Sequence, residues 1–124
     1  IAWSLSLSFF LIFLMNLCPG EVWLADLGLA AKTRPVVVIS RQDPDPPRAL
    51  VTYAPLTTQN RKSRYEVLLP KVHFLEHQSV FNVQGIGSIP IARLERKLGT
   101  PPDQTLREIQ QALLYLLDMQ DEED

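Results

Sequence analysis

The sequence predicts a small, mainly β domain, in which an antiparallel barrel is followed by C-terminal helices. Five short apolar segments follow one another between residues 20 and 89 and are separated by turn and loop sequences. Short strands at such spacing are typical of small antiparallel barrels, whereas parallel β/α units need longer crossovers. Two segments with helical signals then complete the prediction.

The composition indicates one globular domain. The chain has 124 residues, of which 46% are apolar and 21% charged, so it can bury a core without disulfides or metals. Its single cysteine, Cys18, excludes an internal disulfide and a multi-cysteine metal site. Nothing in the cysteine usage indicates an oxidising compartment.

The expected strands differ in how they are covered. The first is expected to direct Val22, Leu24 and Leu27 inward, whereas the second, "RPVVVIS", is a continuous apolar run typical of a strand covered on both faces. Two glycines in the fifth suggest a bulge or a close backbone approach. A surface loop is expected at "RQDPDPP", which carries three prolines. The strands are expected at residues 20–27, 34–40, 48–55, 63–70 and 79–89, and the loop at 41–47.

Two C-terminal helices are expected. The first covers residues 90–99, because Pro90 stands at its first position and Gly99 just past its end. The second covers residues 100–119, with Thr100 as N-cap and Asp103 three residues later, in a capping-box arrangement. One face of this second helix is apolar at helical spacing and is expected to pack on the core; it consists of Leu106, Ile109, Leu113, Leu116 and Leu117.

Charge is distributed unevenly along the chain. The net charge is −2, yet seven basic and only two acidic residues lie between residues 32 and 64, and five of the last seven residues are acidic. A basic middle segment fits a surface that binds a polyanion. The alternative is an ordinary solvated surface with an acidic tail.

The sequence lacks the motifs of several kinds of catalytic site. There is no glycine-rich phosphate loop, no HExxH and no CxxC. The only histidines, His73 and His77, stand four residues apart in an expected loop without a third ligand, so a metal site is not expected. A serine or cysteine triad would need a positioned histidine.

Two segments carry residues suited to an anionic ligand. Arg34 stands directly before Pro35, which fixes the arginine in an extended conformation at the start of a buried strand. In "YAPLTTQNRKSRYEV" (53–67), the hydroxyls of Thr57 and Thr58 precede two amides and three basic residues, which are common ligands of phosphates and base edges. Alternatively, Arg34 is a solvated strand end and the second segment is a polar hairpin loop.

Together these elements resemble the PemK/MazF family of toxin endoribonucleases. The resemblance runs from about residue 20 to residue 119, through "GEVWLADLG", "KTRPVVVIS", "APLTT", "VQG" and "LERKLG". It implies an SH3-like β-barrel with helices and a homodimer whose interface groove takes single-stranded RNA. It also implies a toxin–antitoxin system, in which a cognate antitoxin protein holds the toxin in check.

The resemblance further implies the site residues. Arg34 and Thr57 match the family's catalytic arginine and threonine, and Thr58 is the neighbouring candidate. RNA supplies its own nucleophile, the 2′-hydroxyl, so neither a metal nor a cofactor is implied, and the products carry 2′,3′-cyclic phosphate and 5′-hydroxyl ends. RNA contacts are expected from Lys32, Gln59, Arg61, Lys62, Arg64 and Gln84.

The sequence departs from the family pattern at two places. The segment "GLAAKT" (28–33) is short and lacks the family's Glu-Gln pair, so no RNA sequence preference is carried over. Gly87 stands where a cation often contacts RNA. Two alternatives therefore stay open: a non-catalytic binder on the same barrel, such as a gyrase inhibitor, and a degenerate toxin that only binds RNA or antitoxin.

Both ends of the sequence are expected to lie outside the toxin domain, which is expected at residues 15–119. Residues 1–14 are apolar and serine-rich, lack the basic region and cleavage site of a signal peptide, and are short for a membrane span. They are interpreted as upstream-translated or leader sequence, with a membrane anchor as the alternative. Residues 120–124 are expected to form an acidic disordered tail, and the protein is expected in the cytoplasm without a membrane partner.

Overall fold

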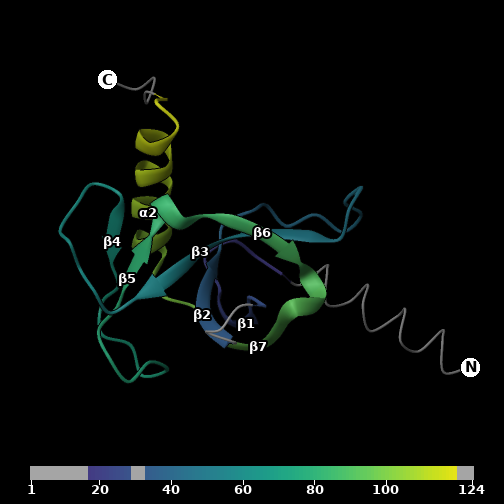
Figure 1. The fold of residues 1–124 in the computed structure, drawn as a ribbon, viewed down its shortest axis with the longest axis horizontal. Helices are drawn as coiled ribbons and strands as arrows, with labels where there is room; N and C mark the ends of the chain where they lie inside the picture. Colours follow the sequence, from purple (N-terminus) through teal and green to yellow (C-terminus); the bar gives the residue numbers. More distant parts are fainter. Residues whose placement is uncertain (1–16, 29–32, 120–124) are drawn as a thin grey trace, which may run out of the picture.

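The structure, a computed structural model of the protein, describes residues 17–28 and 33–119. The expectations for residues 1–14 and for the tail at 120–124 fall outside the described residues. The described part contains seven strands, two 3-10 turns and one helix (Figure 1). In chain order these are β1 (Val22–Asp26), β2 (Thr33–Val38), β3 (Leu50–Thr57), β4 (Glu66–Leu68), β5 (Val80–Asn82), η1 (Val83–Gly85), β6 (Gly87–Pro90), η2 (Ile91–Arg93), β7 (Leu94–Gly99) and α2 (Asp103–Leu116).

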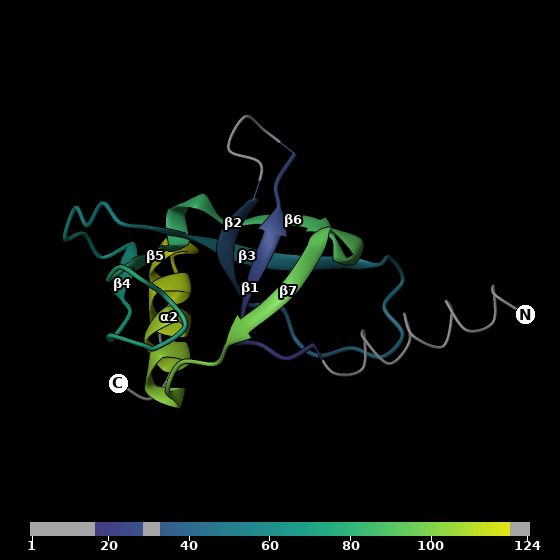
Figure 2. The ribbon, with the colours of Figure 1, turned by 90° about the horizontal axis from the view of Figure 1, so that it is seen from below.

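The strands form one antiparallel sheet in the order β4-β5-β3-β2-β1-β7, and β6 also pairs with β3. This confirms the prediction of a mainly β, antiparallel fold, and one of the two predicted C-terminal helices is present. Because β4 and β7 end the order, the sheet is not closed into a complete barrel. Figures 1 and 2 both show α2 lying beside β4 and β5, away from β7.

Strand β3 is long because it belongs to both halves of the sheet. Along one edge it pairs with β2, and along the other it pairs first with β6, through Leu50 to Tyr53, and then with β5, through Leu56 and Thr57. Pro55 falls between the stretches paired with β6 and β5. Since proline lacks a backbone donor, this gap is where a central strand tolerates it.

Apolar side chains cover both faces of the central strands. One cluster lies between the sheet and α2 and includes Val37, Phe81 and Ile109. A second cluster lies on the opposite side and includes Val36 and Val38. Successive valines of β2 therefore enter different clusters, as the period of two in a strand requires. This confirms the prediction that this strand is covered on both faces.

The prediction of a helix at residues 90–99 is wrong. These residues form the end of β6, the short turn η2 and the strand β7, which pairs with β1. Gly99 does not end a helix; a Cβ atom at this position would overlap the ring of Phe74, so the glycine permits a close approach. Pairing along the edge of β1 outweighs the weak helical preference of the segment.

Other predicted boundaries also change. The strand expected at residues 63–70 shortens to β4, and the segment 79–89 divides into β5, the turn η1 and β6. Its two glycines do mark close approaches, since a Cβ at Gly85 would lie 2.9 Å from the Asn82 amide nitrogen and one at Gly87 would lie 3.0 Å from the Tyr53 hydroxyl. In β1, Leu24 is only half-buried, whereas Ala25, which points to the opposite face, is buried in the second cluster.

The second predicted helix exists but is shorter than expected. Helix α2 begins at Asp103, preceded by Pro102 in the N-cap position, so the proposed cap at Thr100 is wrong. Ile109 is fully buried, and Leu113 and Leu116 pack against the same cluster. Leu117 lies beyond the last helical turn and is 58% exposed, so its assignment to the packed face is wrong.

One carboxylate is buried away from the helix. Glu21, which is 6% exposed, accepts hydrogen bonds from the Cys18 backbone at 3.1 Å, the Trp23 indole at 3.2 Å and the Lys97 ammonium at 2.9 Å. These bonds tie the start of β1 to β7 and satisfy the buried charge. Within residues 17–28 and 33–119, no helix is long and apolar enough to cross a membrane.

The burial difference along α2 generates a stability prediction. Ile109→Ala should lower the free energy of unfolding by about 2–5 kcal/mol, because it opens a cavity in a core that α2 shares with the sheet. The control Leu117→Ala, at an exposed position, should change it by less than about 0.5 kcal/mol. Urea denaturation followed by circular dichroism measures both; equal losses would contradict this description of the helix.

Candidate functional site

The register between β2 and β3 brings Arg34 and Thr57 to the same end of the two strands. Val36 pairs with Pro55, and two residues further along each strand come Arg34 and Thr57. Side chains two residues apart on a strand lie on the same face, so both point to the same side beyond the end of this ladder. The backbone of Arg34 is held from the other edge, where it pairs with Ala25 of β1.

Arg34 and Thr57 line one cavity of about 380 Å³. Its walls come from the ends of β2, β3 and β5, from the loop that joins β3 to β4, and from the turn η1. The structure thus brings together five of the residues selected from the sequence: Arg34, Thr57, Gln59, Arg61 and Gln84. The other lining residues are Pro55, Leu56, Ser63, Tyr65, Glu66 and Asn82.

Thr57 is half-buried and oriented by a local hydrogen bond. Its Oγ1 accepts the backbone N–H of Gln59 at 3.2 Å. A hydroxyl has one proton to donate besides its acceptor sites, so this bond leaves the Thr57 proton available for an oxygen in the cavity. Thr58 is exposed and does not line the cavity.

The loop between β3 and β4 folds around one carboxylate. Oε2 of Glu66 accepts the Arg61 N–H at 3.1 Å, while Oε1 accepts the Ser63 N–H at 3.0 Å and the Ser63 hydroxyl at 2.9 Å. These donors favour the ionised form, so the hydrogen bonds from the Ser63 and Arg61 backbones lower the pKa of Glu66 below its usual value, and the positive charge of Arg61 adds to the effect.

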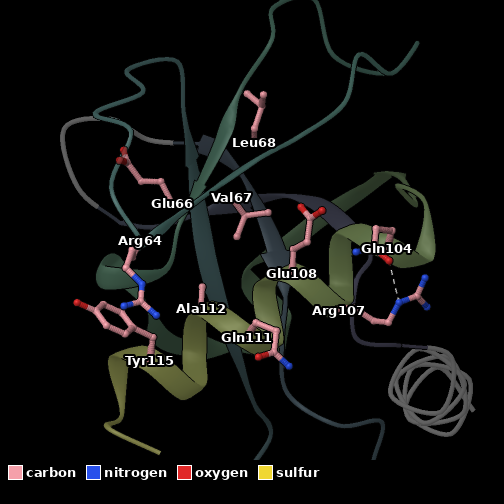
Figure 3. A pocket seen from close by; sticks show the side chains of 10 residues that line it. All are labelled: Arg64, Glu66, Val67, Leu68, Gln104, Arg107, Glu108, Gln111, Ala112 and Tyr115. Carbon is pink, nitrogen blue, oxygen red and sulfur yellow. Dashed lines mark hydrogen bonds between the residues drawn. The ribbon is translucent and has the colours of Figure 1, made fainter. Parts of the chain in front are cut away.

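Other candidate residues lie outside this cavity. Lys62 is exposed with a left-handed backbone (φ +56°), and Arg64 turns away, with its guanidinium carbon 3.9 Å from the centre of the Tyr115 ring. Figure 3 shows Arg64 beside Tyr115 in a neighbouring groove between β4 and α2. This groove has a volume of about 360 Å³ and shares Glu66 with the Arg34–Thr57 cavity. Lys32 falls outside the described residues, and Gly87 does not line the cavity.

Four polar lining residues were not selected from the sequence: Ser63, Tyr65, Glu66 and Asn82. Three of them, Ser63, Tyr65 and Glu66, lie in the segment 53–67. In that segment the sequence analysis selected only the threonine hydroxyls, the amides and the basic residues. Asn82 joins them because it pairs with Glu66 across β4 and β5. Strand pairing is the missing signal, since it connects residues far apart in the sequence.

No metal cluster is found in the described part of the chain, where no three His, Cys, Asp or Glu side chains come together. His73 and His77 lie on the loop after β4; His73 meets the ring of Phe74 edge-on, and Nε2 of His77 is 3.9 Å from Glu76. The donors in the Arg34–Thr57 cavity are instead guanidinium, hydroxyl, amide and phenol groups, which bind anions and hydrogen-bond acceptors.

The sequence and the fold agree with one family of proteins. A family model described as "PemK-like, MazF-like toxin of type II toxin-antitoxin system" matches residues 18–117. Similar proteins from Mycobacterium tuberculosis include the probable endoribonuclease MazF5, 34% identical over 80% of this chain and 91% of that protein, and the endoribonuclease MazF3, 35% identical over 55% and 66%.

Solved structures of toxins of this kind have a similar fold. The M. tuberculosis toxin MazF-mt6 superposes with a TM-score of 0.72 at 28% identity, covering 82% of this chain and 99% of the toxin. A mycobacterial endoribonuclease solved with its cognate antitoxin superposes with a TM-score of 0.73 at 24% identity, covering 84% and 97%, and supports the fold alone. The superposition with MazF-mt6 covers nearly the whole of that toxin, so the two share the fold of a small toxin domain. The chain belongs to the PemK-like, MazF-like toxin family of type II toxin–antitoxin systems.

The Glu66 contacts generate a titration prediction. Because the folded-state pKa is lowered, the ionised carboxylate is favoured above the unfolded pKa, and its contribution to loop stability is lost as pH falls through the folded value. The side-chain carbon resonance of Glu66, followed by NMR, should titrate below the usual glutamate range. In Ser63→Ala, which loses the hydroxyl donor, the midpoint should rise toward that range; an unchanged midpoint would contradict the geometry.

Proposed function

We propose that this toxin is an endoribonuclease, an mRNA interferase, that cleaves single-stranded RNA without a metal ion. The observation that carries the proposal is that Arg34 and Thr57, at the same end of the neighbouring strands β2 and β3, line one cavity. The mycobacterial relatives named as endoribonucleases support the activity. No observation favours the alternative of a non-catalytic binding module.

The proposed reaction uses the nucleophile of the substrate. The ribose 2′-oxygen attacks phosphorus, a new 2′-O–P bond forms, and the 5′-O–P bond breaks. The 2′-hydroxyl loses a proton and the departing 5′-oxygen gains one, so no net proton is consumed. The products are a 2′,3′-cyclic phosphate and a 5′-hydroxyl end. The protein contributes in-line positioning of the reacting groups and stabilisation of negative charge on the phosphorus oxygens.

Arg34 and Thr57 divide that work. A guanidinium has N–H donors and no acceptor and can donate two parallel hydrogen bonds to phosphate oxygens, so Arg34 suits charge stabilisation and not the role of a base. Thr57 donates its hydroxyl proton to a nonbridging oxygen. Glu66 is also unsuited to be the base, because hydrogen bonds from the loop lower its pKa and occupy both oxygens.

Flanking nucleotides would contact the surrounding polar residues. Gln59, Arg61 and Gln84 face the same cavity and suit base edges or phosphates. The candidates outside the cavity, Thr58, Lys32, Lys62 and Arg64, are proposed for more distant parts of the strand. Contacts from cations to phosphates make RNA affinity fall with rising salt.

The proposed partners follow from the same function. We expect a homodimer, with RNA bound in a groove at its interface, and a cognate antitoxin that lays an extended or helical segment into that groove. The family description, a toxin of type II toxin-antitoxin systems, supports such a partner. Since the substrate is mRNA, the proposed location is the cytoplasm.

The test is RNA cleavage by the full chain in the presence of EDTA. Long single-stranded RNA should give discrete fragments with 5′-hydroxyl ends. Arg34→Ala and Thr57→Val should each lower the rate by about 10²–10³-fold, the usual cost of removing one transition-state donor. Thr57→Ser, which keeps the hydroxyl, should retain most of the activity.

The control is Arg48→Ala, which removes a cation from an exposed position outside the cavity and should cleave at the parental rate. If the folded, antitoxin-free parent protein leaves RNA intact, the nuclease proposal is wrong and a binding module is favoured. Equal cleavage by the parent and Arg34→Ala would remove Arg34 from the site.

A further inference from the structure

The loop between β3 and β4 has little apolar support before Arg64 and Tyr65, which contact the Tyr115 ring. Residues 59–64 are all exposed, and together they carry two amides, three basic side chains and one serine. Asn60 accepts the Lys62 N–H at 2.8 Å, which accompanies the left-handed backbone at Lys62. Polar contacts must therefore hold residues 59–63 against their conformational entropy.

Glu66 supplies the central contact. Its two oxygens accept the Arg61 N–H, the Ser63 N–H and the Ser63 hydroxyl, all within 3.1 Å. The hydroxyl oxygen of Ser63 in turn accepts the Tyr65 N–H at 3.2 Å. The Ser63 carbonyl oxygen accepts the Glu66 N–H at 3.2 Å. Charge-assisted bonds of this kind are the stronger class, so removing the carboxylate removes several supports at once.

Glu66 is itself fixed by the sheet. It is the first residue of β4 and pairs with Asn82 of β5, while the next residue, Val67, is buried in the core cluster beneath α2. The hydrogen bond from Arg61 to Glu66 therefore ties the backbone of an exposed arginine to the folded sheet. Arg61 and Glu66 line the same cavity as Arg34 and Thr57.

We infer that Glu66 is a positioning residue, which holds the 59–66 loop so that the Arg61 guanidinium faces RNA bound in the Arg34–Thr57 cavity. This inference rests on the proposed function. A carboxylate in an RNA site would by itself repel phosphates. Here its oxygens are bound by loop amides, and the arginine that the loop presents supplies the opposite charge.

The experiment is a double-mutant cycle on RNA binding by the full chain. The probe is a single-stranded oligonucleotide with 2′-O-methyl riboses, which cannot be cleaved, and its Kd is measured by fluorescence anisotropy. Arg61→Ala should raise Kd by about tenfold, comparable to the loss of one charge-assisted hydrogen bond. Arg61→Ala should also reduce the slope of log K against log salt by about 0.7.

Glu66→Gln keeps the size of the side chain but removes the charge. It should raise Kd about as much as Arg61→Ala, and the double variant should bind no more weakly than either single variant. Glu95→Gln, the same change at an exposed position outside the cavity, should leave Kd unchanged. Additive effects, an unchanged Kd or tighter binding in Glu66→Gln would each overturn the inference.

Two further measurements separate this inference from its rivals. If Glu66 were the general base, Glu66→Gln would lower kcat on cleavable RNA and remove the acidic limb of the pH–rate profile, which would overturn a positioning role. Amide hydrogen exchange at Arg61 and Ser63, measured without RNA, should speed up in Glu66→Gln while core amides keep their protection. Unchanged exchange overturns the inference.

The proposed function fails by a different result. If the parent chain neither binds nor cleaves RNA, the endoribonuclease proposal is wrong, whatever the exchange data show. If the parent cleaves RNA but the binding cycle is additive, the function stands and the role of Glu66 is wrong. The two conclusions are therefore decided by separate observations.

Discussion

The rest of the molecule depends on the double pairing of β3. This strand pairs with β2 along one edge and with β6 and then β5 along the other, so it connects the two halves of the sheet. Its last residue, Thr57, is consequently fixed between β5 and the end of β2. The register of β2 against β3 brings Arg34 to the same end of the sheet, where both residues line one cavity. A slip of one residue would send these side chains to opposite faces, so the strand pairing that builds the core also builds the site.

Local sequence signals predicted the parts of the fold that local chemistry decides. Prolines marked the exposed loop at 41–47, β-branched residues marked β2, and helical spacing placed Ile109 in the core. Arg34 and Thr57 were selected because they match a family motif, and Gln59, Arg61 and Gln84 were selected with them. The structure brings these five residues to one cavity.

Prediction failed where distant residues decide the outcome. The segment at 90–99 has a proline at its start and a glycine at its end, but it forms β7 because the edge of β1 needs a partner. The ring of Phe74, 25 positions away in the sequence, requires the glycine at 99. Asn82 reached the site only through its pairing with Glu66. A single sequence carries no signal for such pairs, whereas it does carry one for capping, turn formation and periodicity.

In the proposed RNA site, Glu66 places a negative charge in the same cavity as Arg34 and Thr57. Backbone donors in an exposed loop are satisfied equally well by water, so they give no fixed geometry by themselves. A carboxylate anchored in β4 replaces that water with bonds of defined direction and accepts three donors from two residues. These donors and the positive charge of Arg61 stabilise the ionised carboxylate, and in the proposed complex they offset its repulsion of phosphate. In the proposed RNA complex, a loop that is already ordered loses less conformational entropy on binding, and this offsets the unfavourable charge.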